Sequence, residues 1–415
     1  MNYKVETSCR SCGGTRVETV IEFGETPLAD RILKEEQLSE PEPKAPLTLA
    51  RCPDCSLVQI RETVDPEVLY FSEYPYFSSV SPALCRHFEG NAEEVMRRKS
   101  LGPDSLVVEA ASNDGCLLRN FVAKNIPVMG IDPSEAPVLR ARAAGVRTLH
   151  EFFTREFAGE LAGKGTRADV FLGNNVLAHV ADLRGFVAGI ATILKEDGLA
   201  VLEMPYLLDL IRHCEFDTIY HQHHCYFSLT SLDRLFRDAG LFINDVQHLT
   251  IHGGSLRIFA EKEERPTGRI REMMEEEKQE GIASGEILAG FAAKVDALRD
   301  ALSGKLIELK RQGKSIAAYG AAGKATTLLA YSQITRELVD FVADLNEYKH
   351  GKYMGGNHLP IVSPAELRAR NPDVVLILAW NFAEEIMNQL EDYRSQGGTF
   401  LIPVPDVRLV GDNVR

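Results

Sequence analysis

Two pairs of cysteines near the start of the chain have the spacing of metal ligands. Cys9 and Cys12 form one Cys-x-x-Cys knuckle, Cys52 and Cys55 form another, and 39 residues separate the two. Four thiolates so arranged suit a tetrahedral Zn²⁺ and leave no open position for water, so we expect a structural ion. The long separation predicts a β-hairpin between the knuckles. The alternatives are unligated thiols or one reducible disulfide, and the other four cysteines are expected to be packing residues.

A cluster of histidines has the composition of an acid–base site. Four of the eleven histidines lie between residues 213 and 224, most of them in Tyr220-His221-Gln222-His223-His224. A neutral imidazole is a good base near pH 7, and methylation of a carbon next to a carbonyl group needs a base to remove the C–H proton. Two alternatives remain open. His221, His223 and His224 could ligate a metal, although no carboxylate lies among them, or they could be ordinary packed histidines.

Two segments read as a strand, a turn of small residues and the start of a helix. In the first, the expected strand at 106–110 runs into a turn that ends at Gly115, and Asp132 ends the next expected strand. Such turns let a ligand approach the backbone, and an acidic residue at the second strand end is placed to bind ribose hydroxyls. Together and in this order, these signals favour a nucleoside cofactor.

The second segment, from Ala318 through Thr327, lacks the spacing of a P-loop. Its helix start and Lys324 are nevertheless suited to binding a pyrophosphate. Asp344 at the next strand end would conventionally indicate NAD(H). The lone tryptophan, Trp380, and Asn381 follow another expected strand and are placed to line the same crevice. A purely structural domain is the alternative.

The remaining elements predict how these residues are positioned. Short buried strands alternate with helices in two stretches, which is typical of doubly wound parallel sheets. A charged segment at 265–312, with an apolar stripe in its second half, predicts a long helical connector interrupted near Gly281 and Gly285. The expected strands are 17–23, 106–110, 128–131, 169–172, 199–204, 315–319, 339–343, 374–378 and 400–402, and the expected helices include 183–194 and 231–239.

Composition limits the class of protein. The chain has 415 residues and a net charge of −14, which argues against a nucleic-acid binder. No run approaches the ~20 apolar residues that span a bilayer, and the first residues carry no apolar signal core. We therefore expect a soluble, cytoplasmic protein of about three domains that does not bind membranes and is a monomer.

As a whole the chain resembles the S-adenosylmethionine-dependent sugar C-methyltransferases that act on nucleotide-linked 4-keto-deoxysugars. The resemblance spans nearly the full length: the four-cysteine segment, the Ser112-Asn113-Asp114-Gly115 loop, the stretch 175–179, the histidine-rich segment and the C-terminal α/β unit. Two positions depart from the family pattern. Ala111 stands where the first glycine of the loop is expected, and Gln222 stands where a glutamate is expected.

The resemblance implies an α/β protein with three domains. These are a zinc-binding domain at residues 1–75, a Rossmann-like class I methyltransferase domain at 76–265, and a helical connector with a second Rossmann-like α/β domain at 266–415. The implied cofactors are S-adenosylmethionine and a structural Zn²⁺. The implied partner is a nucleotide-sugar substrate, expected to be dTDP-linked, held between the last two domains.

The resemblance also assigns residues to the site. His223 would be the general base that removes the proton at C3. The other expected catalytic residues are Tyr220, Gln222, His179 and Tyr76. The expected cofactor contacts are Glu109, Ala111, Ser112, Asn113, Asp114, Gly115, Asp132, Pro133, Asn174, Asn175 and Val176. The expected substrate contacts are Tyr76, Ser78, His252, Gly253, Gly254, Tyr319, Gly320, Lys324 and Asn381.

Three other functions remain open from the sequence. The C-terminal unit would suit an NAD-dependent oxidoreductase of a sugar nucleotide. Gln222 and Ala111 are compatible with a non-catalytic nucleotide-sugar binding protein. Methylation at oxygen or nitrogen is the third, because it needs no carbonyl group to acidify a C–H bond.

Overall fold

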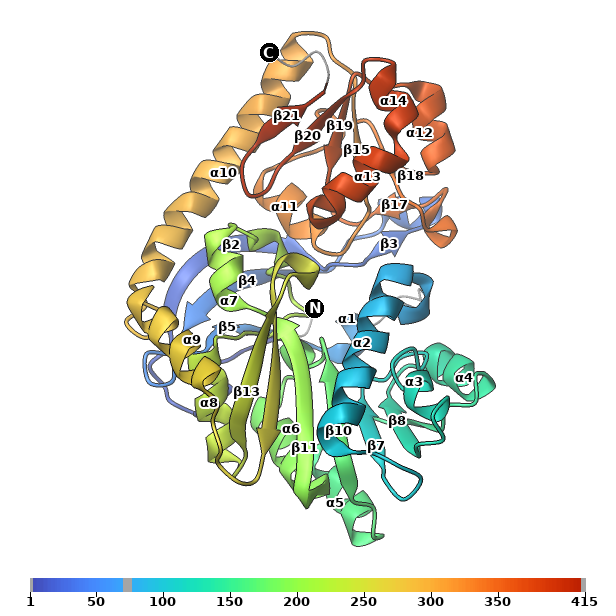
Figure 1. Ribbon diagram of the computed structural model, residues 1–415. Coiled ribbons are helices and arrows are strands. Elements are labelled where there is room, and N and C mark those ends of the chain that lie inside the picture. The colour runs from blue at the N-terminus through green and yellow to red at the C-terminus, as the bar shows by residue number, and fades with distance from the viewer. Residues whose placement is uncertain (1–2, 70–76, 412–415) are drawn as a thin grey trace.

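The computed structural model describes residues 3–69 and 77–411 (Figure 1). Its largest part is a seven-stranded sheet in the order β13-β14-β11-β10-β7-β8-β9. The five strands from β11 to β9 are parallel, while β14 runs antiparallel between β11 and β13. The strands are β7 (Val107–Ala110), β8 (Val128–Asp132), β9 (Thr148–His150), β10 (Ala168–Asn174), β11 (Leu194–Pro205), β13 (Phe242–Leu249) and β14 (Ser255–Glu261).

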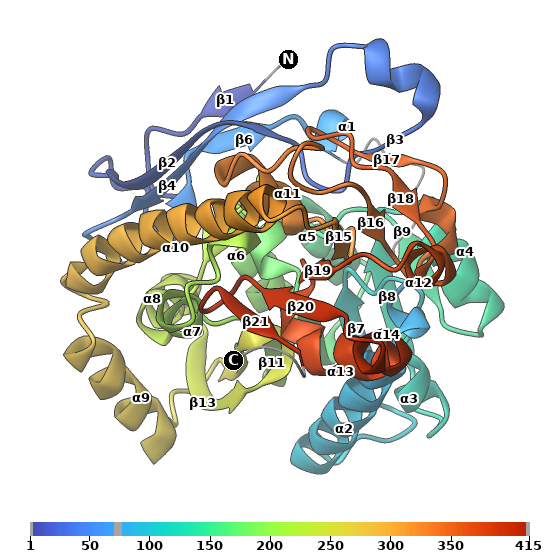
Figure 2. The same cartoon turned by 90° about the horizontal axis from the view of Figure 1, so that it is seen from above.

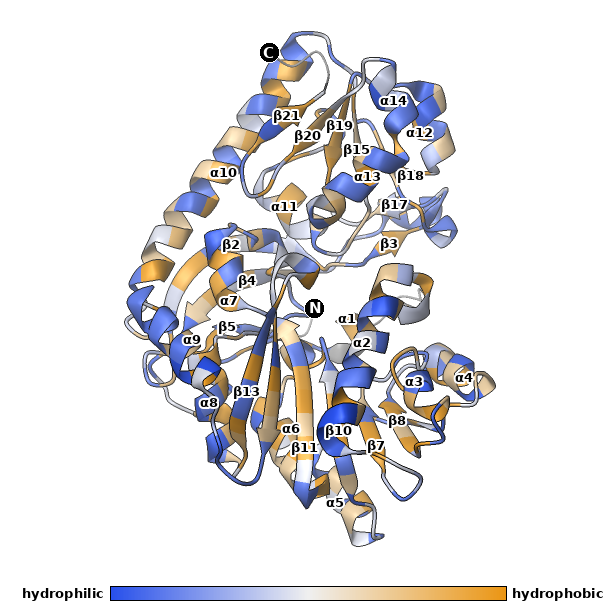
Figure 3. Ribbon diagram, viewed as in Figure 1, coloured by the Kyte–Doolittle hydropathy of each residue, from blue (hydrophilic) through white to orange (hydrophobic). Residues whose placement is uncertain are grey.

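Helices cover this sheet because its inner strands have apolar side chains on both faces. All residues of β7 and β8 are buried, as a parallel sheet requires, and both strands are drawn largely in the orange of hydrophobic residues (Figure 3). The helices of this unit are α2 (Pro82–Lys99), α3 (Arg119–Val122), α4 (Glu135–Ala143), α5 (Arg155–Gly163), α6 (Leu183–Ile193), α7 (Leu207–Arg212) and α8 (Leu229–Asp238). The parallel doubly wound sheet is therefore confirmed.

A second sheet forms the C-terminal domain, in the order β18-β16-β15-β19-β20-β21, with only β21 antiparallel. The expected strand at 339–343 is shorter than predicted, because the Val339 amide bonds to the Thr335 carbonyl in a turn. The strands are β15 (Ile316–Tyr319), β16 (Val342–Ala343), β18 (Ile361–Val362), β19 (Val374–Ile377), β20 (Thr399–Ile402) and β21 (Arg408–Val410). The helices are α11 (Ala325–Tyr331), α12 (Pro364–Arg370), α13 (Ala383–Gln389) and α14 (Glu391–Ser395).

The helical connector consists of α9 (Gly268–Gln279) and α10 (Glu286–Arg311). The break between them has Gly281 and Gly285 at φ of 81° and 80°, in the left-handed region that glycine adopts at no steric cost. The apolar stripe of α10 is buried, and the helix runs beside α7 and β2 (Figure 2). The interrupted connector is confirmed.

The N-terminal domain is built from short antiparallel strands that also recruit strands from the other two domains. A four-stranded sheet has the order β12-β5-β4-β2, and β3 pairs with β17. Its own strands are β1 (Tyr3–Val5), β2 (Glu18–Pro27), β3 (Ile32–Leu33), β4 (Lys44–Arg51), β5 (Val58–Ile60) and β6 (Glu62–Val64), followed by α1 (Pro66–Leu69). The recruited strands are β12 (Cys225–Tyr226) and β17 (Tyr353–Met354).

Within the described residues, no helix has the length and hydropathy needed to cross a membrane.

Candidate functional site

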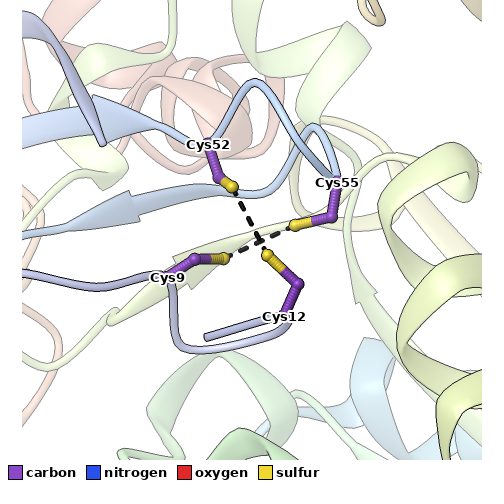
Figure 4. A group of neighbouring side chains, drawn as sticks. All are labelled: Cys9, Cys12, Cys52 and Cys55. Atoms are coloured by element: carbon purple, nitrogen blue, oxygen red, sulfur yellow. Dashed lines mark hydrogen bonds between the residues drawn. The ribbon is translucent and has the colours of Figure 1, made fainter. Parts of the chain in front are cut away.

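The four knuckle cysteines converge as metal ligands do (Figure 4). Sγ of Cys9 lies 3.4 Å from Sγ of Cys55, and Sγ of Cys12 lies 3.6 Å from Sγ of Cys52. All four sulfurs lie within 4.8 Å of one another. These separations are far longer than a disulfide bond of about 2.05 Å. They approach the edge of about 3.8 Å expected for a tetrahedron with Zn–S bonds of ~2.3 Å, so the donor set fits Zn²⁺.

The chain between and beside the knuckles connects the zinc site to the rest of the fold. The β2–β4 hairpin lies between the two knuckles, as predicted. The Arg10 amide in the first knuckle donates to Oε1 of Gln59 at 2.8 Å, and Gln59 is fully buried on β5. Because β5 pairs with β12, the zinc site is linked through one strand to the segment that carries the histidine cluster.

The turn after β7 forms the predicted cofactor loop. Ala111, Asn113 and Gly115 have φ of 53°, 49° and 75°. Ala111 therefore holds a conformation that favours glycine, the residue expected there. The Asp132 carboxylate shapes this loop, since it accepts hydrogen bonds from the amides of Asn113 and Ser134, both at 2.8 Å.

Several buried polar atoms at this sheet edge have no hydrogen-bond partner within the described part of the chain. Such atoms are costly unless a ligand satisfies them. They are Asn91 Oδ1, Glu109 Oε2, Ser112 Oγ, Asp114 Oδ1, Asn174 Nδ2 and Asn175 Oδ1. All but Asn91 were predicted from the sequence. This set of donors and acceptors fits the amino-acid and adenosine groups of S-adenosylmethionine.

Asn91 escaped prediction because it lies on a helix. It is buried on α2, and its Nδ2 donates to Oδ1 of Asn174 at 3.5 Å. The signal available in the sequence was a polar residue within the apolar stripe of that helix, between Phe88 and Val95.

Nearby, burial raises the pKa of Glu109 well above its ordinary value, and the Asp132 and Asp114 carboxylates add to this shift.

The segment before α2 closes over the cofactor loop. The Ser78 amide donates to Oδ1 of Asn113 at 2.9 Å, and Oγ of Ser79 donates to Oδ2 of Asp114 at 2.5 Å. Ser78, predicted to contact substrate, thus contacts the loop. Tyr76 lies outside the described residues.

The Pro133 carbonyl accepts a hydrogen bond from the ring of His150 at 2.8 Å. Val176 precedes the 3₁₀ turn at Leu177–His179.

His223 lies in a compact group of rings. Its Nδ1 is 2.8 Å from the Thr218 carbonyl oxygen, and its Nε2 is 2.9 Å from the Tyr220 hydroxyl. The His179 ring meets it edge-on at a centroid distance of 4.7 Å. Burial lowers the pKa of His223 well below its ordinary value, helped by His179. Burial also lowers the pKa of His179 to about 4, although a hydrogen bond to the Gln222 backbone acts to raise this pKa.

The N-terminal domain holds one side of this histidine segment. The β12–β5 pairing is extended by the Ile60 amide, which donates to the His224 carbonyl at 3.0 Å. Nε2 of His221 donates to the Pro46 carbonyl at 3.0 Å. Among the described residues, only the four cysteines form a group close enough to hold a metal. A metal site made by these histidines is therefore not supported.

The C-terminal domain holds the other side. Oγ1 of Thr327 donates to the Ile219 carbonyl at 2.7 Å, and Nε1 of Trp380 donates to Oδ2 of Asp217 at 2.7 Å. Asp217 is fully buried in the 3₁₀ turn Phe216–Thr218. The histidine segment is thus fixed by both outer domains.

Lys324 lies at the contact between the central and C-terminal domains. Its Nζ donates to Oδ1 of Asn381 at 2.5 Å and lies 3.8 Å from the centre of the Trp380 ring. Burial lowers the pKa of Lys324, and the carboxylates of Asp217 and Glu215 oppose this shift. Lys324 and Asn381 are therefore brought together as predicted, and both already contact protein groups.

The other predicted substrate residues lie near this contact. His252 has a φ of 58° in a turn between β13 and β14. A side chain at Gly253 would collide with the Glu215 carboxylate, and one at Gly254 with that of Asp209. Glycine is therefore needed at both positions because carboxylates of the protein itself pack against them. The sequence instead predicts that these glycines leave room for the substrate.

The turn after β15 repeats the arrangement of the cofactor loop. Asp344 accepts hydrogen bonds from the amides of Ala321 and Asn346, both at 2.8 Å, as Asp132 does in the central domain. Gly320 in this turn has a φ of 94°. The Tyr319 hydroxyl is turned away from it toward Gln389, at 3.3 Å.

Comparisons with known proteins agree with this architecture. Three family models match: "Putative zinc binding domain" at residues 9–70, "Methyltransferase domain" at 86–245 and "C-methyltransferase C-terminal domain" at 250–405. C-methyltransferase NovU of Streptomyces niveus is 34% identical over 407 residues, which cover 97% of this chain and 96% of NovU.

Other matches cover smaller parts of the chain. A ubiquinone biosynthesis O-methyltransferase of Rhodopseudomonas palustris (strain TIE-1) is 26% identical over 125 residues, 30% of this chain and 48% of that protein. The crystal structure of the glycopeptide N-methyltransferase MtfA with S-adenosylmethionine aligns with 42% of this chain and 94% of its own, at 12% identity and a TM-score of 0.34.

The fold, the family models and the unpaired polar atoms of the sheet edge place the chain among the S-adenosylmethionine-dependent methyltransferases. More particularly, the full-length similarity to NovU shows that it belongs to the C-methyltransferase family with an N-terminal zinc domain. It is therefore a C-methylating enzyme that uses S-adenosylmethionine and holds Zn²⁺ at four cysteines. An oxidoreductase, a non-catalytic binding protein and methylation at oxygen or nitrogen are set aside.

Proposed function

We propose that this enzyme methylates C3 of a nucleotide-linked 4-keto-deoxysugar, with a dTDP-sugar as its substrate and His223 as the general base. The observation that carries the proposal is the pair of hydrogen bonds that the His223 ring makes. A backbone carbonyl only accepts hydrogen bonds, so Nδ1 carries the proton that it donates to Thr218. Nε2 is then an acceptor, and the Tyr220 hydroxyl donates to it. The site therefore holds a neutral imidazole that can take a proton through the Tyr220 hydroxyl.

A base is what distinguishes methylation at carbon from methylation at oxygen or nitrogen. Bound S-adenosylmethionine supplies an electrophilic methyl group, and a carbon nucleophile must be generated to receive it. Burial keeps His223 uncharged at neutral pH, which is the form that accepts a proton. Because Tyr220 occupies the lone pair of Nε2, the phenol passes its own proton to Nε2 as its oxygen takes the one from C3.

The contact between the central and C-terminal domains supports an anionic substrate. Lys324 is the cation there, beside Asn381 and the lone tryptophan. The turn after β15 also has the backbone arrangement of the cofactor loop. A nucleoside diphosphate bound here would place its sugar toward the ends of β10 and β11, which point to the C-terminal domain (Figure 1). We propose that the enzyme binds it as a monomer.

Proton exchange tests this function without requiring methyl transfer. A dTDP-4-keto-6-deoxysugar is incubated in D₂O with enzyme and S-adenosylhomocysteine, and the C3 proton signal is followed by NMR. We expect exchange with the wild type, and a loss of at least ~10²-fold in His223→Asn. His358→Asn is the matched control, because His358 pairs with Glu42 between the outer domains. Absence of exchange in the wild type, despite binding of the sugar nucleotide, would refute the proposal.

A further inference from the structure

Two cysteines outside the zinc site lie in contact beside the cofactor loop. Sγ of Cys85, in the first turn of α2, is 3.2 Å from Sγ of Cys116, the residue that follows Gly115. Cys116 is buried, whereas Cys85 is half-buried and reaches the surface. A disulfide bond has an S–S distance of about 2.05 Å, so the two thiols are separate here but need only a small movement to be joined.

This cysteine pair is not a metal site. Three pairs of sulfurs contact one another in the described part of the chain, and two of them belong to the zinc knuckles. Among the described residues, only the four knuckle cysteines form a group of ligands close enough to hold a metal. The thiols of Cys85 and Cys116 are therefore available for chemistry of their own.

Packing brings the two sulfurs together. Cys116 belongs to the apolar cluster that also contains Leu84, and Cys85 packs against this cluster. A Cβ at Gly115 would come within 2.9 Å of Val146, so the chain just before Cys116 is tightly packed. The first helix after this chain is α3, which lies beside α2 (Figure 1). The contact between the sulfurs is therefore a consequence of how α2 packs on the chain that follows the cofactor loop.

The segment at 77–81, which leads into α2, covers the cofactor loop. Ser79 donates from its amide and from its hydroxyl to Oδ2 of Asp114, at 3.3 and 2.5 Å. Sγ of Cys85 lies 3.6 Å from the Ser79 carbonyl oxygen. Asp114 is buried, and its other oxygen is one of the unpaired atoms that fit S-adenosylmethionine. The segment that contacts Cys85 thus lies over a cofactor residue.

We propose that Cys85 and Cys116 are a modification site, at which a reversible disulfide fixes segment 77–81 on the cofactor loop and slows the exchange of S-adenosylmethionine and S-adenosylhomocysteine. A ligand reaches the free oxygen of Asp114 when Ser79 moves away, and a covalent bond between α2 and the loop opposes that movement. Disulfides of this kind in reducing compartments are usually transient and sense oxidants. The switch does not depend on which substrate the enzyme methylates.

The burial of the two thiols indicates which one reacts first. Burial, then the hydrogen bond with Cys85, raises the pKa of Cys116 to about 12. Cys116 therefore keeps its proton at neutral pH and donates it toward Cys85. Cys85 is the more exposed sulfur and is the one that an oxidant from solvent meets.

Hydrogen peroxide is the oxidant, and the reaction balances in atoms and electrons. The Cys85 thiolate attacks one peroxide oxygen, the O–O bond breaks, and a sulfenic acid and water result. The Cys116 sulfur then attacks the Cys85 sulfur. The S–S bond forms, the S–O bond breaks, and hydroxide leaves with the Cys116 proton as a second water. The two sulfurs lose two electrons in total, and the peroxide gains them.

The test compares the zinc-containing wild type with Cys85→Ser before and after treatment with hydrogen peroxide. Cys214→Ser is the matched control, because it removes a different buried thiol. Disulfides are located by mass spectrometry of peptides prepared without reductant. Binding and release of tritiated S-adenosylmethionine are timed by rapid filtration. A chelating dye reports zinc release, so that the peroxide dose is kept below the one that damages the knuckles.

In the wild type and Cys214→Ser, peroxide should link Cys85 to Cys116 and slow both binding and release of the cofactor by at least ~10-fold. Dithiothreitol should restore both rates. Cys85→Ser should keep its untreated rates. The proposal would be overturned if the zinc-containing wild type forms no such link, or if the linked enzyme exchanges cofactor at the untreated rate. Equal slowing in Cys85→Ser would also overturn it, because another group would then be the one that responds.

Discussion

The contact between Trp380 and Asp217 allows a quantitative test of how the C-terminal domain positions the catalytic segment. Trp380→Phe removes the indole N–H that donates to Asp217 at 2.7 Å, in a setting where Asp217 is fully buried. A hydrogen bond to a charged group contributes about 1.5–3 kcal/mol, and a buried acceptor left unpaired incurs its desolvation cost. The smaller ring adds roughly 1 kcal/mol of lost burial. We therefore expect the free energy of unfolding to fall by about 3 kcal/mol.

A double-mutant cycle separates the hydrogen bond from the loss of ring area. Trp380→Phe, Asp217→Asn and the double variant are unfolded with urea and followed by far-ultraviolet circular dichroism. The coupling free energy should be about 1.5–3 kcal/mol. Tyr393→Phe is the control, because its hydroxyl bonds to the Thr399 carbonyl within the C-terminal domain at 3.1 Å.

Activity provides the second readout. Asp217 lies three residues before Tyr220, so loss of its anchor should lower kcat of Trp380→Phe by an order of magnitude or more, while Tyr393→Phe keeps its kcat. A coupling below about 0.5 kcal/mol, or an unchanged kcat, would refute the reasoning that this contact holds the catalytic segment.

Three further predictions concern the zinc site, the cofactor loop and a buried carboxylate. Cys52→Ser or chelation of Zn²⁺ should remove hydrogen-exchange protection at Cys225–Tyr226 and lower kcat, because β5 then holds β12 less firmly. Full protection in the chelated enzyme would contradict this link. Asp132→Ala should raise the Kd of S-adenosylmethionine at least ~10-fold by calorimetry, because the Asn113 amide loses its acceptor; an unchanged Kd would be the contrary result. Burial, together with repulsion by the Asp217 carboxylate, raises the pKa of Glu215 from 4.5 to about 8. The native state therefore keeps this proton longer than the unfolded state, and stability falls as pH rises from 4.5 to 8. Glu215→Gln should flatten that slope in urea midpoints measured from pH 5 to 9, and an unchanged slope would show that another group titrates.

The sequence predicted the sheets better than it predicted the contacts between domains. Buried runs such as 106–110 and 374–378 were recognisable because parallel strands are apolar on both faces. The two-residue strands β12 and β17 carry no such signal, because only their tertiary partners in the N-terminal domain make them strands.

The candidate site shows the same division. The cofactor loop and the cysteine knuckles are each recognisable from residues that are close in sequence. In the structure, the four cysteines converge on one point, and the loop residues have unpaired polar atoms at one sheet edge. Cys85 and Cys116 could not be paired from the sequence, since one lies in an amphipathic helix and the other follows the cofactor loop. Their relation depends on a packing distance between residues 31 positions apart.

The pairing of β5 with β12 also affects the order of events during synthesis. Residues 61–224 separate these strands, so at ~5–20 residues per second the edge of β5 has no partner for on the order of ten seconds. β3 stays unpaired for longer during synthesis, because its partner β17 begins only at Tyr353. During that time the zinc knuckles stabilise a sheet with an open edge, which is a template for wrong pairing between nascent chains. A ribosome-bound chain would therefore need chaperone protection of this edge until the histidine segment has emerged.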